Sequence, residues 1–519
     1  MTYIKLRTVA SSFALALAAT ACNNDKLTSL NKNPNSPEDV PPATLFTAGA
    51  VRGVNLWLGA GYDLRGTEFV TQHLAEVQYP DEDTYRRLTG GSTQGYFDNP
   101  YIQQLEDYQK VIDKGTAANQ AGVYGPALVM RTWEFGYLTN TWGDIPYVDA
   151  LKGDAASGSL SPKYDAQKDI YADFFVVLAK ASTDMGAGSG SLGNGDPIYG
   201  GDLQHWQKFS NSLRARYALQ LVNVDAATAR AQLTAAFAAP GGVFTSNDDN
   251  AQLSWPGDGI YNNPWAANFS TRDDHRVSQV LMNLMKANND PRIPVYAQPV
   301  PGEGVYRGAP NALTAANAAP YILSTSRPGA VFYPGNTAYG FFGGAGNSFP
   351  SFLMTYAEVE FIKAEAVERG LASPGGTAAS HYLAGIRASM EQWGVPDSEI
   401  NAYLAQGSVA YMGGTAGLQQ IGQEKWIALY TDGGQAWAEW RRTCQPMSVQ
   451  PGPAATQSNV PRRFQYSITE KSVNIENVNA AIAVQGADTF TSRMYWDKSP
   501  TAAPTYFVGC GVRGQAPAP

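Results

Sequence analysis

Residues 423–443 read QEKWIALYTDGGQAWAEWRRT, with three tryptophans, one tyrosine and a pair of glycines. Its first half has the i, i+3, i+4, i+7 spacing of one helix face, at Gln423, Trp426, Ile427 and Tyr430. Gly433-Gly434 interrupts this pattern, as glycine does at helix ends, and a second face follows at Ala436, Trp437 and Trp440. Arg441-Arg442 fall in the last turn, where the helix dipole favours cations. The stretch predicts a helical hairpin whose three tryptophans lie in the core.

Helical periodicity continues outward from this hairpin. It predicts helices over residues 42–58, 67–77, 101–112, 126–138, 165–185, 206–221, 226–237, 277–286, 352–369 and 378–393. Consecutive helix pairs favour an all-α, tetratricopeptide-like scaffold, although the chain shows no fixed repeat of about 34 residues. We expect a single domain over residues 42–519, with the scaffold at 42–240 and 351–445.

Two regions lack this periodicity. Residues 241–350 are dominated by glycine, proline, asparagine and isolated aromatics. Because so long a loop region inside a compact domain is usually functional, we expect the ligand to bind there. Residues 446–519, after Cys444, show no regular pattern and predict an irregular C-terminal tail.

The N-terminus has the order of an export signal. Lys5 and Arg7 precede an apolar run at residues 9–19, and Cys22 follows three small or polar residues later. The run is too short to span a bilayer and is typical of a signal peptide. We predict a signal peptide over residues 1–21, a lipid on Cys22 and a tether over residues 22–41. The alternative is a soluble secreted protein.

The cysteine count favours a disulfide outside the cytoplasm. The chain has three cysteines, and a lipid on Cys22 leaves an even pair, Cys444 and Cys510. In an oxidising compartment such a pair is predicted to be bonded, and a buried pair of free thiols is the alternative.

The composition argues against nucleic acid as a partner. The chain has 37 Lys and Arg against 45 Asp and Glu, and loss of Lys5 and Arg7 with a signal peptide leaves 35 − 45 = −10. Such a chain repels phosphate backbones. Only 16% of the residues are charged, so uncharged polar side chains supply much of the surface, which suits neutral polar ligands.

Residues with catalytic or metal chemistry do not form a known motif. None of the four histidines has a partner at ligand spacing: His73, His205, His275 and His381. Glu358 and Glu365 share a helix face with backbones about 10 Å apart, and we interpret both as structural. We predict no enzymatic activity and no cofactor. The oxygen-rich segments 81–83 and 247–250 lack the full spacing of a calcium loop, which leaves a structural calcium ion open.

Aromatic residues in the loops are the candidate ligand contacts. They are Tyr79, Tyr96, Phe97, Tyr261, Trp265, Phe269, Tyr333, Phe341 and Phe342. Sugar rings stack on aromatic faces and leave their hydroxyl groups to polar side chains, of which Asn262, Asn263 and Arg272 lie near Trp265. We expect Trp265 to be an exposed stacking ring. The alternative is that these rings pin the loops onto the body.

Several blocks, in order along the chain, resemble the SusD/RagB family of outer-membrane nutrient-binding lipoproteins. Besides the hairpin at 423–443, they are NPN at 33–35, LTNTWGDIPY at 138–147, KFSNSL at 208–213, DPRIP at 290–294, TYAEVEF at 355–361, PRRF at 461–464 and YWDK at 495–498.

The resemblance implies a helical scaffold with a loop-rich ligand face at the cell surface, lipid-anchored in the outer membrane. It implies capture of an oligosaccharide for polysaccharide utilisation, with a SusC-like TonB-dependent transporter as partner. A secreted glycan-cleaving hydrolase and a bare helical-repeat scaffold for proteins are the alternatives.

Overall fold

The computed structural model describes residues 39–153, 158, 160–335, 346–497 and 509–514. The described residues from Pro42 onward pack as a unit of their own. The predicted signal peptide, the lipidation at Cys22 and the ring of Phe341 lie outside the described residues. Among the described helices, none combines the length and hydropathy of a membrane span.

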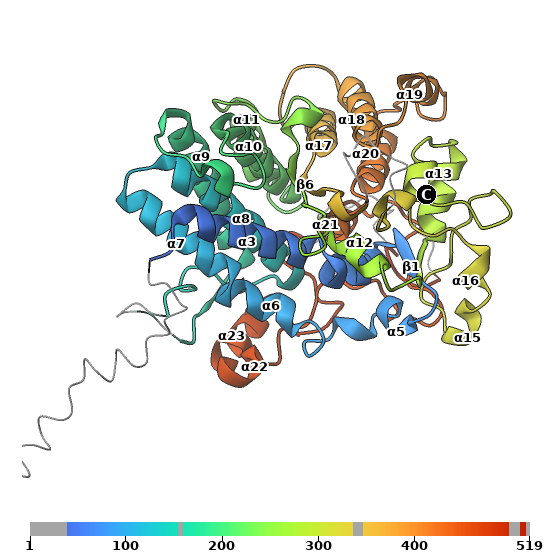
Figure 1. Cartoon of the computed structure of the whole chain (residues 1–519), viewed down its shortest axis with the longest axis horizontal. Coiled ribbons are helices and arrows are strands. Elements are labelled where there is room, and N and C mark those ends of the chain that lie inside the picture. Colours follow the sequence, from blue (N-terminus) through green and yellow to red (C-terminus); the bar gives the residue numbers. More distant parts are fainter. Residues whose placement is uncertain (1–38, 154–157, 159, 336–345, 498–508, 515–519) are drawn as a thin grey trace, which may run out of the picture. The chain divides into compact units, whose positions relative to one another are not determined.

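The first half of the unit is a series of helices in which each packs on the next. They are α3 (Pro42–Trp57), α7 (Gln104–Ala117), α8 (Ala121–Trp142), α9 (Gln167–Ala187), α10 (Leu203–Gln220) and α11 (Ala226–Phe237). The neighbour packing runs from α3 through α7 to α11 (Figure 1). Asp202 and Asp225 cap α10 and α11 by accepting hydrogen bonds from first-turn amides. The all-α, tetratricopeptide-like scaffold is confirmed.

A second group of helices follows the insertion. It comprises α17 (Tyr356–Glu368), α18 (Ala378–Gln392), α19 (Asp397–Leu404), α20 (Gly414–Ala428) and α21 (Gly433–Thr443). Because α17 packs against α18, α20 and α10, it joins the two groups. Helices α20 and α21 form the predicted hairpin, and their tryptophans Trp426, Trp437 and Trp440 are all fully buried.

The turn of this hairpin differs from the prediction. Gly433 and Gly434 do not end a helix; they begin α21, with Asp432 as its cap. A Cβ atom on Gly433 would lie 2.6 Å from the backbone nitrogen of Glu68, and one on Gly434 would lie 2.8 Å from the ring of Tyr137. The two glycines therefore allow close packing between α21 and its neighbours.

A sealed ion network joins four helices beneath the hairpin. It consists of Arg216 on α10, Glu358 and Glu365 on α17, Lys425 on α20, and Glu439 and Arg442 on α21, each with a side chain at most 3% exposed. Arg442 pairs with Glu365 and with Glu439, each at 2.6 Å. Arg441 packs on Trp437 at 3.7 Å. These arginines are thus core residues, and Glu365 is buried with them.

The insertion contains short helices and strands. Its helices are α12 (Pro264–Phe269), α13 (Gln279–Ala287), α14 (Ile293–Tyr296), α15 (Ala315–Ala318) and α16 (Tyr321–Ser324). The described part of the chain as a whole contains three two-stranded antiparallel sheets: β1 (Leu74–Glu76) with β5 (His275–Val277), β2 (Ile145–Pro146) with β3 (Tyr164–Asp165), and β4 (Ala251–Leu253) with β6 (Ser351–Met354).

Two further predictions need correction. Residues 67–77 are not one helix: a π-helix, η1 (Ala60–Thr67), leads into α4 (Glu68–Thr71) and then into β1. The tail is not wholly irregular, because it contains α22 (Glu470–Val473) and α23 (Ile475–Gln485). Helix α23 buries only Val478 and Ala481, so its apolar periodicity is too weak to stand out in the sequence.

The structure contains the Cys444–Cys510 disulfide, the pair that the cysteine count favoured. Cys444 directly follows α21. A Cβ atom on Gly511 would lie 2.5 Å from the ring of Trp440, so the last described segment packs tightly on the hairpin.

Candidate functional site

Strands β1 and β5 bring two distant parts of the sequence together. They pair antiparallel, with Glu76 opposite His275. The chain after β1 enters α5 (Pro80–Asp83), while Arg272 lies just before β5. Side chains from residues 76–87 therefore meet side chains from residues 272–275.

Tyr79 is the exposed aromatic ring of this region. Its side chain is 54% exposed, and the guanidinium of Arg272 lies 4.5 Å from the centre of its ring. Arg272 is itself fixed, since its Nε donates to both carboxylate oxygens of Asp274 at 2.9 and 3.0 Å. A ring backed by an anchored cation is a rigid platform that loses little entropy when a ligand stacks on it.

Three arginines hydrogen-bond to the carboxylate of Glu82. Its carboxylate accepts hydrogen bonds from Nε of Arg65 at 3.1 Å, Nη1 of Arg87 at 2.6 Å and Nη2 of Arg272 at 3.3 Å. The Glu82 side chain is 3% exposed, whereas those of Arg65, Arg87 and Arg272 are 28%, 51% and 18% exposed. Burial opposes ionisation, but Arg65 and Arg272 hold the pKa of Glu82 below its usual value. We call these three arginines the arginine rim.

A small cavity of about 40 Å³ adjoins Arg65 and Arg87. Its other walls are mainly aromatic and hydroxyl side chains: Tyr62, Tyr96, Phe464, Ser92 and Thr93. Tyr96 is half-buried and packs edge-on against Tyr62 at 5.8 Å. Burial raises the pKa of Tyr96, so its phenol keeps its proton at neutral pH. The cavity has room for a few water molecules or for a small polar group of a ligand.

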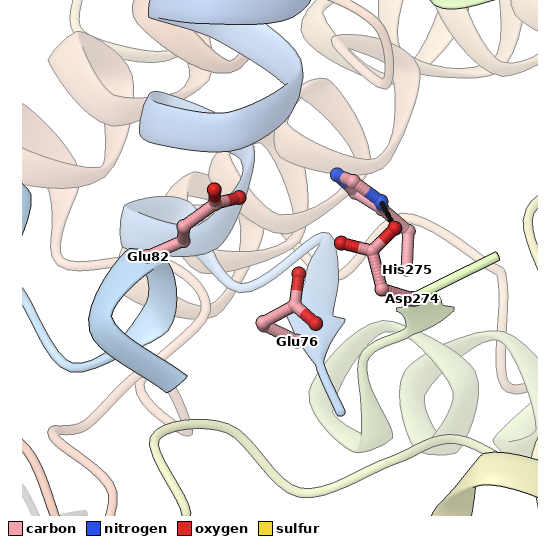
Figure 2. A group of neighbouring side chains, drawn as sticks. All are labelled: Glu76, Glu82, Asp274 and His275. Carbon is pink, nitrogen blue, oxygen red and sulfur yellow. Dashed lines mark hydrogen bonds and ion pairs between the residues drawn. The ribbon is translucent and has the colours of Figure 1, made fainter. Parts of the chain in front are cut away.

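Three carboxylates and an imidazole converge beside the rim. The ligand-type atoms of Glu76, Glu82, Asp274 and His275 lie within 4.8 Å of one another, and Figure 2 shows the four side chains facing a common space. Such donors suit a divalent cation. Arg272, however, lies in ion-pair range of all three carboxylates, so a guanidinium already supplies the positive charge of this group.

The same group holds a proton at neutral pH. Burial and the charge of Asp274 raise the pKa of Glu76 to about 9. Burial opposes the ionisation of Asp274 as well, but hydrogen bonds from His275 and Arg272 hold the pKa of Asp274 below its usual value. Burial lowers the pKa of His275, which makes its imidazole neutral. At pH 7 Glu76 is therefore protonated beside an ionised Asp274.

The structure places three of the candidate residues in structural roles. The expectation that Trp265 is an exposed ring is wrong: it is 3% exposed, and its Nε1 donates to Asp63 of η1 at 3.2 Å. The side chain of Asn263 caps α12 and donates to the carbonyl of Phe349. The side chain of Asn262 accepts a hydrogen bond from the backbone of Gly259 within a turn.

Two other candidate tyrosines have different neighbours from Tyr79. Tyr261 is 54% exposed and lines a cleft of about 640 Å³ with Trp255 and residues of α3. Tyr333 is half-buried and stacks on Phe269 at 4.6 Å, so it pins its loop to the body. Of the candidates, the structure brings together Tyr79, Tyr96 and Arg272 around Glu82.

A family model described as "Starch-binding associating with outer membrane" matches residues 34–467, more than half of the chain. The chain belongs to the SusD-like family. No match was found among curated protein sequences.

Solved structures share the SusD-like fold over nearly the whole chain. A chitin-binding protein is 25% identical with a TM-score of 0.76, over 88% of this chain and 100% of that one. A chitin-binding SusD homolog from Flavobacterium johnsoniae is 23% identical with a TM-score of 0.73, over 88% and 99%. A SusD homolog from Bacteroides uniformis is 22% identical with a TM-score of 0.75, over 89% and 100%. The last two show the fold alone.

Of the charged residues of this site, the sequence predicts only Arg272. Glu76, Arg65 and Arg87 are not among the predicted site residues, because no motif or spacing in the sequence connects them. In the sequence, the acidic segment 81–83 suggests only oxygen ligands for a calcium ion. In the structure, Glu82 binds the arginine rim, and Asp83 accepts hydrogen bonds from the backbones of Glu76 and Ala312. The signal available in the sequence was the pair Arg86-Arg87 shortly after Tyr79, which could have predicted a charged site near that ring.

Proposed function

We propose that this SusD-like protein captures an oligosaccharide at the cell surface on the Tyr79 platform and the arginine rim. It does so without catalysis, anchored by a lipid on Cys22, and passes the ligand to a SusC-like TonB-dependent transporter. The family's association with starch and the outer membrane supports the general role. The chitin-binding relative makes amino-sugar oligosaccharides one class to include in any test.

The exposed ring of Tyr79 carries the proposal. Sugar rings bind by their C–H faces to aromatic platforms, and Tyr79 is 54% exposed while Arg272 holds it in place. The rim adds guanidinium N–H donors beside this ring, and these can donate to uncharged hydroxyl groups. Tyr96 contributes a second, half-buried ring beside Arg65 and Arg87.

The carboxylates considered for glycan cleavage support a binding protein instead. Glu358 and Glu365 are 1% and 2% exposed, and arginines occupy both. A general acid or nucleophile has to reach the glycosidic bond, and these side chains do not reach solvent. Capture without cleavage fits the residues better.

The test is calorimetric titration with a panel of maltohexaose, chitohexaose and cellohexaose. Tyr79→Ala should weaken binding of the bound glycan by about 1–3 kcal/mol, by analogy with bases stacked on aromatic rings. Tyr261→Ala is the matched control, because Tyr261 is also 54% exposed but lines a different cleft. If Tyr261→Ala abolishes binding and Tyr79→Ala does not, the platform is wrongly placed.

A further inference from the structure

An uncharged cleft of about 400 Å³ lies between α13 and residues 448–453. No charged side chain is among the described residues that line it. The lining contrasts with that of the arginine rim, which is charged. Its volume falls in the range of small-ligand sites.

Helix α13 divides its residues between the core and this cleft. Its buried residues are Leu281, Met282 and Met285. Gln279 and Asn283, at i and i+4, face the cleft, and so do Val280 and Leu284 at the next pair of positions. Along one wall, amide groups thus alternate with aliphatic surface.

The two amides of this wall are open to a ligand. Gln279 and Asn283 are both exposed, and neither side chain hydrogen-bonds to another described residue. Each amide offers both a donor and an acceptor, which matches the hydroxyl and acetamido groups of sugars.

The side chains at the floor of the cleft are held in place by hydrogen bonds. Gln72 is 2% exposed, and its side-chain amide exchanges hydrogen bonds with the backbone of Gln450. Asn311 is 7% exposed; it accepts from Ser278 at 2.5 Å and donates to the carbonyl of Leu74 at 2.7 Å. A Cβ atom on Gly452 would lie 1.9 Å from the carbonyl oxygen of Asn311, so the backbone of Gly452 packs directly against this floor.

We propose that this cleft is a second saccharide site that takes one or two rings of a neutral sugar. Val280, Leu284 and Pro453 supply apolar surface for the C–H faces, while Gln279 and Asn283 pair with the polar groups. Since it has no charged lining, the site does not select acidic sugars, and its affinity does not depend on salt. The saccharide class rests on the proposed function; the site itself is separate from Tyr79.

The experiment isolates the cleft in the Tyr79→Ala protein. Saturation-transfer NMR titrations use diacetylchitobiose, cellobiose and maltose, with digalacturonic acid as an anionic disaccharide of equal size. At least one neutral disaccharide should bind, equally at low and high salt, and the anionic one should not. Adding Gln279→Ala with Asn283→Ala should weaken that binding about tenfold, the loss of one or two hydrogen bonds. The control is Gln204→Ala, an exposed amide on α10 outside the cleft.

The possible outcomes separate this inference from the proposed function. If the intact protein binds oligosaccharide but the Tyr79→Ala protein binds no neutral disaccharide, the second site is excluded and the platform stands. Unchanged affinity in the Gln279→Ala, Asn283→Ala protein also excludes it. Loss of disaccharide binding only after Gln279→Ala and Asn283→Ala are added supports the cleft, and the platform at Tyr79 is then judged by its own hexasaccharide titration. If the intact protein binds no saccharide, both proposals fall.

Discussion

The sealed ion network and the arginine rim both pair arginines with glutamates, but the network is buried and the rim is partly exposed to solvent. In the network, Arg442 is fully buried between Glu365 and Glu439, and no charge reaches solvent. In the rim, the carboxylate of Glu82 is buried but its arginines are not, and Arg87 is 51% exposed. Buried pairs fix the geometry of packed helices, whereas half-exposed arginines keep donors for a ligand. The comparison indicates that exposure, not residue type, separates scaffold from site.

The largest expected effect comes from breaking the sealed network. Arg442→Ala leaves Glu365 and Glu439 buried without their main counter-charge and should lower the free energy of unfolding by about 3–5 kcal/mol. Arg369→Ala is the control, because Arg369 pairs with the same Glu365 at 2.7 Å but is 26% exposed. That change should cost less than about 1 kcal/mol. Equal losses in denaturant unfolding would show that burial does not separate the two pairs.

The second largest effect comes from the disulfide, which belongs to the scaffold and not to the site. It closes a segment with a sequence separation of 66, so a protein with Cys444→Ala and Cys510→Ala should lose about 2–4 kcal/mol of stability. Oxidised and reduced wild-type protein give the same comparison without a substitution. Glycan affinity should not change, since the bond lies at the end of α21 and not at the rim. A loss of affinity at full folding would connect the tail to the site.

The smallest effect, when expressed per pH unit, concerns the proton that Glu76 holds beside the rim. The pKa of Glu76 is raised to about 9 in the folded protein, so the folded state holds a proton that the unfolded chain has released above about pH 4.5. Stability contributed by Glu76 therefore falls as pH rises towards 9, by about 1 kcal/mol per pH unit near neutrality. Glu76→Gln imitates the protonated form and should flatten that decline.

The measurement is urea unfolding of both proteins at a series of pH values between about 6 and 9. The control is Glu303→Gln, an exposed residue that pairs with Arg307 on the surface. Parallel curves for wild type and Glu76→Gln would mean that Glu76 ionises normally.

Local periodicity was enough to predict much of the scaffold. The expected helix over 226–237 coincides with α11, and the expected helix over 378–393 with α18, because each has amphipathic spacing and a capping residue. The predictions that failed concern residues whose surroundings are set by contacts far away in the sequence. Trp265 has the glycine- and asparagine-rich flanks of a loop, yet Asp63, far away in sequence, receives its indole N–H in the core.

The site was only partly predictable for the same reason. Tyr79, Tyr96 and Arg272 could be proposed as isolated aromatic or polar residues in loops. Their meeting at Glu82 depends on the pairing of β1 with β5, two strands of three residues that leave no alternation to recognise. Strands so short are set by the surrounding fold, and no spacing within either segment reveals them.

The most direct measurement is a crystal structure of the protein with the tightest-binding hexasaccharide of the titration panel. The account predicts a sugar ring stacked on Tyr79 within about 4 Å, with hydroxyl groups in hydrogen-bond range of Arg87 or Arg272. Sugar density confined to the Tyr261 cleft, with Tyr79 left bare, would contradict it.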